Sequence, residues 1–251
     1  MQTSNRLEHP VLMVSLGGSI VEKRPSSFQL ITDRGFPSVI AHLRFPADSS
    51  IGSKGDSVTV SLFYGNDEYL LFTGEIYDAA THGTYRDLAL TDDYKKLCDT
   101  GIVAAYREEM ASVILQDALD AAGIENTAIT CPDVEVARFS TQNIPAEKVI
   151  THLIDVLFHH GHEGYRFFFD EKNIFHFGTK DDTGKNDGEV FEFETGKTIF
   201  KKGAKRIDVL PLPIRHTQDV LIDGEKHTTF RTDLSISGNR SRLYLWMEAS
   251  K

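Results

Sequence analysis

The sequence predicts an α+β protein that is mostly β, with two small antiparallel β-barrel-like domains flanking an α/β unit that has two main helices. Short segments with apolar residues at alternate positions, separated by Gly, Asn and Asp, fill both ends of the chain, as is typical of antiparallel strands. Two central segments instead carry apolar residues at helical spacing. A polar stretch at 179–188 follows them. We therefore expect domains at 1–92, 93–180 and 181–251, and leave open whether the last is a complete barrel.

The N-terminal domain is expected to consist of successive strands. Its clearest feature is a hairpin in which apolar side chains alternate along 58–64 and again along 70–76, with a turn at 65–67. Gly74 lies inside the second of these strands, which predicts a β-bulge or a close approach of another backbone. The remaining expected strands are 11–16, 27–32, 39–45 and 85–91. The apolar run at 11–16 is too short for a secretory signal and lacks a basic start, so we interpret it as a strand.

The middle of the chain has helical periodicity. A first helix is expected where apolar residues recur between 110 and 121, with Gly123 as a stop signal. A second helix carries an apolar stripe along 149–158, and either Asn143 or Ile144 is its expected cap. The unit is completed by a strand at 134–139 and an aromatic hairpin at 165–169 and 174–177.

Strand patterns return in the C-terminal part. The polar stretch 179–188 is the best candidate for a linker or mobile loop. The expected strands beyond it are 190–193, 207–210, 218–222, 228–231 and 243–247. Asp223-Gly224 marks a hairpin turn between two of them.

Composition argues against several classes of partner, although it does not exclude a local basic patch. The net charge is −10 and the pI about 5.4, which does not suit a general phosphate-binding surface, so we expect no nucleic-acid partner. No segment approaches the roughly 18 consecutive apolar residues of a membrane span, so no membrane partner is expected. The two cysteines, Cys98 and Cys131, are too few for a disulfide scaffold and fit buried, reduced thiols in a cytoplasm.

Catalytic motifs do not emerge from the sequence. Residues 17–21 lack the final glycine of a hydrolase elbow, and 52–56 lack the Gly-Lys-Ser/Thr ending of a phosphate loop. Paired acids could do acid–base chemistry, but each pair lies at an expected element end or loop, which favours a solvated surface. These pairs are Asp92-Asp93, Glu108-Glu109 and Asp181-Asp182. The first pair could also cap a helical turn at 95–98. We therefore predict no enzyme activity, no catalytic residue and no cofactor.

A histidine cluster raises the question of a metal site. Four histidines, His152, His159, His160 and His162, gather with Glu163 near the end of the second helix. Imidazoles bind zinc, but the spacing of a His-Glu-x-x-His motif is missing and no cysteine pair is near. Histidines in the last turn of a helix are favoured by its negative dipole end. We prefer this helix-end interpretation and predict no metal site.

A basic cluster stands out against the acidic background, and three interpretations of it stay open. It consists of Lys197, Lys201, Lys202, Lys205 and Arg206. It could contact nucleic acid, but only Phe200 is available for base stacking. It could instead be a solvated strand edge that guards against aggregation, or a rim that docks onto an acidic partner.

The aromatic hairpin is the most informative unusual feature. Five phenylalanines, Phe167, Phe168, Phe169, Phe175 and Phe177, fall within it. A hairpin cannot bury two faces by itself, so we expect one face to contact the preceding helix and the other to contact a second domain or subunit.

Taken in order, these segments resemble the baseplate hub family of contractile-tailed phages, which includes late-control D proteins and the hub portion of type VI secretion spikes. Residues 55–60 (Gly-Asp-Ser-Val-Thr-Val) and 69–78 (Tyr-Leu-Leu-Phe-Thr-Gly-Glu-Ile-Tyr-Asp) are similar to the first barrel of hub proteins. The helix ending at Gly123 and the segment from Phe139 to Phe177 follow in the family's order. The resemblance covers about residues 11–178.

The resemblance implies a structural role. It implies a homotrimer in which two similar barrels per subunit form a ring of pseudo-sixfold symmetry, joining a hexameric tail tube to a trimeric spike. Tube and spike proteins would be its partners, and its place would be the baseplate of a virion tail or a related injection machine, assembled in the bacterial cytoplasm. Many relatives are longer, so the second barrel could be shortened.

Two alternatives of other classes remain. A tail-tip glycan hydrolase would need a pair of acids about 5–10 Å apart. A host- or carbohydrate-binding β module would need exposed aromatic rings, for which Trp246 is the only tryptophan.

Overall fold

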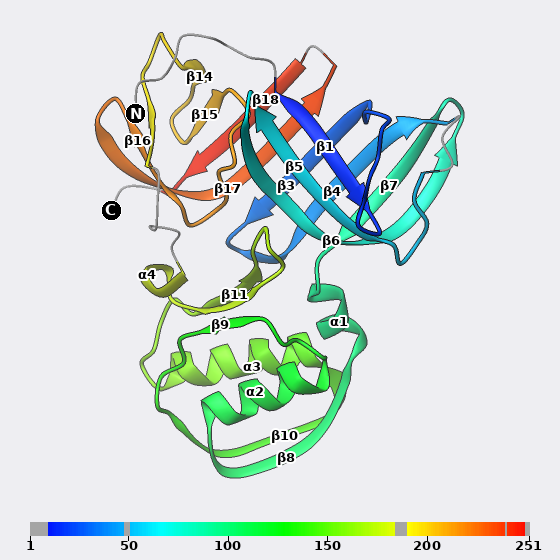
Figure 1. Cartoon of the computed structure of the whole chain (residues 1–251). Helices are drawn as coiled ribbons and strands as arrows, with labels where there is room; N and C mark the ends of the chain where they lie inside the picture. The colour runs from blue at the N-terminus through cyan, green and yellow to red at the C-terminus, as the bar shows by residue number, and fades with distance from the viewer. Residues whose placement is uncertain (1–9, 48–50, 184–189, 239, 249–251) are drawn as a thin grey trace.

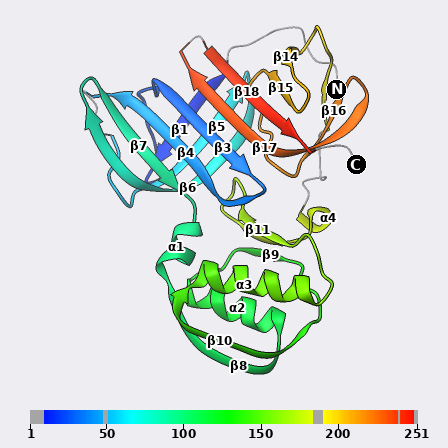
Figure 2. The same cartoon turned by 180° about the vertical axis from the view of Figure 1, so that it is seen from behind.

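The computed structural model describes residues 10–47, 51–183, 190–238 and 240–248 (Figure 1). Strands dominate and a few helices are concentrated in the middle of the chain, which confirms the α+β, mostly-β class. Both views place the two strand-rich ends of the chain side by side, with the α/β unit below them (Figures 1 and 2). None of the helices in these ranges has the length and apolarity to cross a membrane.

The N-terminal strands alternate between core and solvent. Every second residue of β3 is buried, including Phe28 and Leu30, because successive side chains of a strand point to opposite faces. All six expected strands are present. The N-terminal strands are β1 (Val11–Leu16), β2 (Ser19–Ile20), β3 (Ser27–Asp33), β4 (Phe36–Pro46), β5 (Ser57–Tyr64), β6 (Asp67–His82) and β7 (Tyr85–Thr91).

The long strand β6 changes partner along its length. It pairs with β5 along 67–75 and with β7 along 75–82. Gly74 lies at this changeover, where a Cβ atom would be 2.2 Å from the carbonyl oxygen of Thr91. The close backbone approach predicted at Gly74 is therefore confirmed.

The α/β unit has a core of its own. Figure 1 shows α2 and α3 between the ribbon β8–β10 and a small sheet of β11, β12 and β9. Its apolar residues form a second core cluster, separate from that of the strands above. The elements are α1 (Tyr94–Asp99), β8 (Gly101–Met110), α2 (Ala111–Ala121), β9 (Thr127–Ile129), β10 (Glu135–Pro145), α3 (Ala146–His159), β11 (Arg166–Phe169) and β12 (Phe175–Gly178).

Three details of this unit differ from expectation. The sequence pattern does not indicate β8, and it assigns Met110 to a helix although Met110 ends that strand. The expected strand at 134–139 extends to Pro145. The expected helix caps are wrong, because Asn143 and Ile144 lie in β10 and Pro145 occupies the N-cap of α3.

The C-terminal part contains the five expected strands and one that the sequence does not indicate, β14. The polar stretch at 179–188 begins with a short helix, and 184–189 lie outside the described residues. The elements are α4 (Lys180–Thr183), β13 (Phe191–Phe193), β14 (Ile199–Lys202), β15 (Arg206–Val209), β16 (Asp219–Ile222), β17 (Glu225–Ser237) and β18 (Arg240–Met247).

Both strand-rich ends belong to one 13-stranded sheet. The strands β3 and β17 pair antiparallel from Arg231 opposite Asp33 to Ser237 opposite Ser27, and this pairing joins the two ends of the chain. Apolar residues from both ends form a single core cluster. The strand path does not close on itself among the described strands, so the two halves are open and barrel-like rather than closed barrels. The domain division at 92 and 180 stays a prediction.

The two halves of the sheet repeat one strand arrangement. In the first half, the hairpin β3–β4 is followed by the meander β5–β6–β7, with β4 beside β7 and β1 beside β5. In the second half, the hairpin β14–β15 is followed by the meander β16–β17–β18, with β15 beside β18 and β13 beside β16. The one difference in direction is that β1 runs antiparallel to β5 and β13 runs parallel to β16. Each chain therefore presents two copies of the same six-strand unit.

Candidate functional site

The aromatic hairpin β11–β12 joins the α/β unit to the sheet. The rings of Phe167, Phe169, Phe175 and Phe177 belong to the core around α2 and α3. Phe168 lies on the other face, where it is 2% exposed. It stacks on His176 at a centroid distance of 5.0 Å and meets the edge of His216 at 4.4 Å. His216 belongs to the connection between β15 and β16, so the prediction of two differently occupied faces is confirmed.

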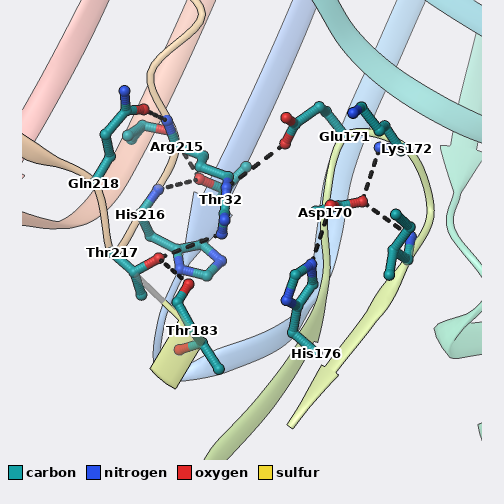
Figure 3. A network of polar contacts seen from close by, with 12 residues as sticks. Thr32, Asp170, Glu171, Lys172, His176, Thr183, Arg215, His216, Thr217 and Gln218 are labelled. Carbon is teal, nitrogen blue, oxygen red and sulfur yellow. Dashed lines mark hydrogen bonds and ion pairs between the residues drawn. The ribbon is translucent and has the colours of Figure 1, made fainter. Parts of the chain in front are cut away.

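Polar contacts connect the hairpin tip and the segment that contains Arg215 and His216 (Figure 3). At the hairpin tip, Oδ1 of Asp170 accepts hydrogen bonds from the backbone N–H groups of Lys172 and Ile174, both at 2.9 Å. Nε2 of His176 donates to Oδ2 of Asp170 at 3.0 Å. These bonds fix the shape of the turn that reaches the sheet.

An arginine from the sheet side covers the same ring. The guanidinium of Arg215 lies 5.1 Å from the centroid of Phe168, and its Nε is 3.6 Å from a carboxylate oxygen of Glu171. The contact thus combines a cation–π interaction with an ion pair across the junction.

His216 is a buried and neutral member of this junction. Its backbone N–H donates to Oγ1 of Thr32 at 3.1 Å, and Thr32 in turn bonds Thr232 at 2.8 Å across the β3–β17 pairing. Burial lowers the pKa of His216 to about 3, and the charges of Arg215 and Arg34 act in the same direction. The imidazole is therefore uncharged near neutral pH, which suits a packing group against Phe168.

An ion-pair cluster connects three further segments near the junction. Glu248, just after β18, binds Arg34 at 3.0 Å and Lys180 at 2.8 Å. Arg34 lies in the β3–β4 turn and Lys180 begins α4. All three side chains are partly exposed, so this cluster contributes modestly to stability but ties three segments together.

Asp92 is placed differently from its prediction. It is 2% exposed, so the expectation of a solvated carboxyl is wrong for this member of the pair. Its Oδ2 accepts from the backbone N–H of Val39 at 3.0 Å and its Oδ1 from that of Tyr94 at 3.2 Å. The N–H of Asp93 donates to the side chain of Asn173 in the hairpin turn at 3.0 Å. The expected helical turn is present as α1, and Asp93 occupies its N-cap without a side-chain capping bond.

Asp92→Asn is expected to change how stability depends on pH. Burial raises the pKa of Asp92 from 3.8 to about 7 in the folded chain. The folded state therefore keeps a proton that the unfolded chain releases above about pH 4, so this group's contribution falls by up to ~1.4 kcal/mol per pH unit until about pH 7. Asparagine does not titrate, so the variant lacks this pH dependence. The difference in unfolding free energy, variant minus wild type, should therefore increase as pH rises from about 4 to about 7.

Urea unfolding followed by circular dichroism, at steps between about pH 5 and about pH 8, measures this difference. Above about pH 8 the carboxyl is ionised in both states, and the gap between the two proteins should stay constant. Parallel stability profiles across the lower range would contradict the buried assignment of Asp92.

The other acid pairs do not converge on one site. Glu108 is exposed and Glu109 is half-buried at the end of β8, away from the junction. Oδ2 of Asp182 accepts hydrogen bonds from the backbone N–H of Thr179, at 2.8 Å, and from its hydroxyl, at 2.7 Å, at the start of α4. These acidic side chains therefore stabilise local turns or lie at the protein surface.

The end of α3 carries His159, His160 and His162 as expected, whereas His152 lies in the middle of the helix, so the helix-end interpretation is wrong for His152. His159 is in the last turn, with Nδ1 2.7 Å from the carbonyl oxygen of Asp155, and His160 is the C-cap residue. Among the described residues, no three potential ligand side chains come together in a way that could hold a metal ion.

The cysteines and the tryptophan are in protected positions. Cys98 and Cys131 are free thiols and half-buried, and burial raises the pKa of Cys131 to about 11.

The guanidinium groups of Arg206 and Arg231 lie over the ring of Trp246, at 5.7 Å and 5.4 Å, where a sugar would otherwise stack.

The basic cluster runs from the turn before β14, through β14, to the start of β15. Lys197 and Lys202 pair with Glu194 and Asp223, and Arg206 pairs with Asp208 at 3.1 Å. Lys201 and Lys205 make no ion pair within the part of the chain that the structure describes. The cluster is therefore a strand edge that keeps free positive charge.

Solved structures share this architecture. A 43 kDa tail protein of the prophage MuSo2 from Shewanella oneidensis superposes with a TM-score of 0.73 at 10% identity, over 96% of this chain and 98% of that protein. The fold is that of phage tail proteins. A tail protein from Neisseria meningitidis MC58 gives 0.71 at 9% identity, over 96% of both chains.

A secretion-system protein has the same fold. The E. coli c3393 protein, a component of the type VI secretion system described as similar to the T4 tail proteins gp27 and gp5, gives a TM-score of 0.67 at 10% identity. The match covers 95% of this chain and 77% of that one. No protein-family model and no curated protein matches the chain by sequence.

Proposed function

We propose that this chain is a non-enzymatic structural subunit of a tail baseplate hub, in a phage, a prophage-derived particle or a related injection machine. The observation that carries the proposal is the sheet in which one six-strand unit occurs twice. The fold shared with phage tail proteins along nearly the whole length of both chains supports it.

The repeat gives a physical reason for an adapter. Three chains in a ring would present six similar strand units while keeping threefold symmetry. Such a ring would contact a hexameric tail tube through its six strand units. Its three α/β units, one per chain, would follow the symmetry of a trimeric spike. Tube and spike proteins are therefore the proposed partners. The proposed location is the baseplate of the virion tail, after assembly in the bacterial cytoplasm.

Binding to tail tubes tests the adapter role. The purified chain is labelled with gold and mixed with assembled tubes of the tube protein encoded beside it. In electron micrographs the gold should appear at one end of the tube rather than along its wall. A zymogram on the same material checks the alternative of a glycan hydrolase. Labelling absent from tube ends, or clearing that is lost when one acid is replaced, would overturn the proposal.

A further inference from the structure

The pairing of β3 with β17 is a joint between two copies of the same strand unit. Along 225–228, β17 pairs with β16. Along 231–237 it has β18 on one edge and β3 on the other. Strand β3 of the first unit thus pairs with β17 in the meander of the second unit, so this edge of β17 has a partner strand.

The corresponding edge of the first unit is open. The counterpart of β17 is β6, which pairs with β5 along 67–75 and with β7 along 75–82. On the edge opposite β7, Ile76 bonds to the loop at 55–56. Beyond it, residues 78–82 make no backbone hydrogen bond to any described residue on that edge.

The counterpart of β3 is also open. That counterpart is β14, which pairs with β15 on one side. Ile199 bonds back to Glu194, whereas Phe200 to Lys202 have no strand beside their outer edge in the described ranges. Figures 1 and 2 place β14 and the β6–β7 hairpin at opposite ends of the strand-rich body, so one chain cannot join them to each other.

We propose that β6 of one copy pairs antiparallel with β14 of a second copy of this chain, so that the β3–β17 joint is repeated between chains. This inference rests on the proposed ring and names the contact that closes it. Each chain contributes one β6 edge and one β14 edge, so the contact is head-to-tail and generates a closed ring when the rotation closes. Two exposed strand edges are thereby covered.

The side chains at the two edges are complementary in charge. Asp78 on β6 makes no ion pair among the described residues, and neither do Lys201 on β14 and Lys205 just after it. The internal joint already carries such a pair, because Arg231 lies 3.5 Å from Asp33 across it. Asp78 is the counterpart of Arg231, so the joint between chains would carry an ion pair with the signs reversed. It would form diagonally with Lys201, because the position directly opposite Asp78 is Gly203.

Exposed rings gather at the same two edges. Phe200 on β14 is 53% exposed and Tyr77 on β6 is 48% exposed. Lys54 and Lys95 lie over the Tyr77 ring, at 5.6 Å and 5.3 Å, so this end of β6 also carries positive charge. The attraction for the basic β14 edge is therefore expected to come from the carboxylate of Asp78, the next residue along the strand.

The internal joint also predicts the register between chains. Both meander strands shift register at one residue, between Ile76 and Asp78 on β6 and between Thr229 and Arg231 on β17. Both hairpins turn through four residues, 33–36 and 203–206. Placing Asp78 where Arg231 lies, and Gly203 where Asp33 lies, sets three further pairs. They are Ala79 opposite Lys202, Ala80 opposite Lys201 and Thr81 opposite Phe200.

Disulfide trapping tests this contact. Directly opposed residues of an antiparallel pair have Cα atoms ~4.5–5.5 Å apart, within the ~4.4–6.8 Å range of a disulfide. The full chain carrying Ala80→Cys and Lys201→Cys should form, under mild oxidation, covalent species up to the size of the ring on a non-reducing gel. The matched control carries Ala80→Cys with Lys148→Cys, which is exposed on α3.

A charge exchange gives a second measurement that does not depend on cysteine geometry. Asp78→Lys alone and Lys201→Asp alone should each weaken self-association at least about tenfold, and the double variant should recover most of the loss. Circular dichroism confirms that each variant is folded.

The outcomes separate the two proposals. Trapping by the first cysteine pair and not by the control, with rescue in the double charge variant, supports the joint. Rings that form without trapping and without any effect of the charge variants overturn the joint and leave the hub proposal standing. A chain that does not associate, alone or with tube protein, overturns both.

Discussion

Replacing Phe168 by alanine is expected to lower the free energy of unfolding by about 3–5 kcal/mol. The side chain is 2% exposed and is enclosed by His176, His216 and Arg215. Removing the ring leaves a cavity between the hairpin and the sheet and deprives Arg215 of its cation–π partner. Chemical denaturation followed by tyrosine and tryptophan fluorescence measures the loss.

Phe158 provides the matched control. It lies near the end of α3 and is 57% exposed, so Phe158→Ala should change stability by less than about 0.5 kcal/mol. Phe168 lies between two separate cores, so its loss should loosen the hairpin locally. Amide hydrogen exchange in the Phe168→Ala protein should therefore increase more at the hairpin turn than in β3. Equal losses for the two variants would contradict the role of Phe168 as the junction residue.

Gly74→Ala is expected to cost about 1–3 kcal/mol or more, although it adds only one methyl group. That methyl would lie 2.2 Å from the carbonyl oxygen of Thr91 and 2.7 Å from the ring of Phe72. The oxygen belongs to the backbone at the start of the β6–β7 pairing, so it cannot move without disturbing that ladder. Thermal unfolding of the purified variant measures the effect.

Gly83 is the control for this substitution. It lies in the β6–β7 turn with φ of +58°, and a Cβ there would meet nothing within 4 Å. Gly83→Asn should therefore cost no more than a few tenths of a kcal/mol, because asparagine tolerates this conformation. A larger loss at Gly83 than at Gly74 would show that β6 and β7 do not approach as closely as the structure has them.

Local patterns predicted the elements whose signals are local. The hairpin of β5 and β6 follows from alternating apolar residues and a Gly-Asn-Asp turn, and the division of the aromatic hairpin into two faces follows from its excess of rings. Strand β8 was not predicted because its segment Ala-Ala-Tyr-Arg-Glu-Glu-Met is equally compatible with a helix. Only its pairing with β10 makes it a strand. Strand β14 has a single buried residue and two lysines, too little pattern to detect.

The candidate site depended on contacts between distant segments. The buried carboxylate of Asp92 accepts a hydrogen bond from Val39, 53 residues earlier, and no feature next to Asp92 in the sequence indicates this contact. The burial of His216 depends on Phe168 in the hairpin, and the β3–β17 joint pairs residues about 200 positions apart. The topological repeat is equally invisible in the sequence, since corresponding strands such as β6 and β17 share no residue pattern.

Electron microscopy combined with mass measurement is the most direct test of the ring-forming hub. Purified untagged chain, at high concentration and with tube protein, should give particles of three times the 28.1 kDa chain mass, and class averages should show closed rings with six similar lobes. A strictly monomeric species under both conditions, with no ring in the images, would contradict it.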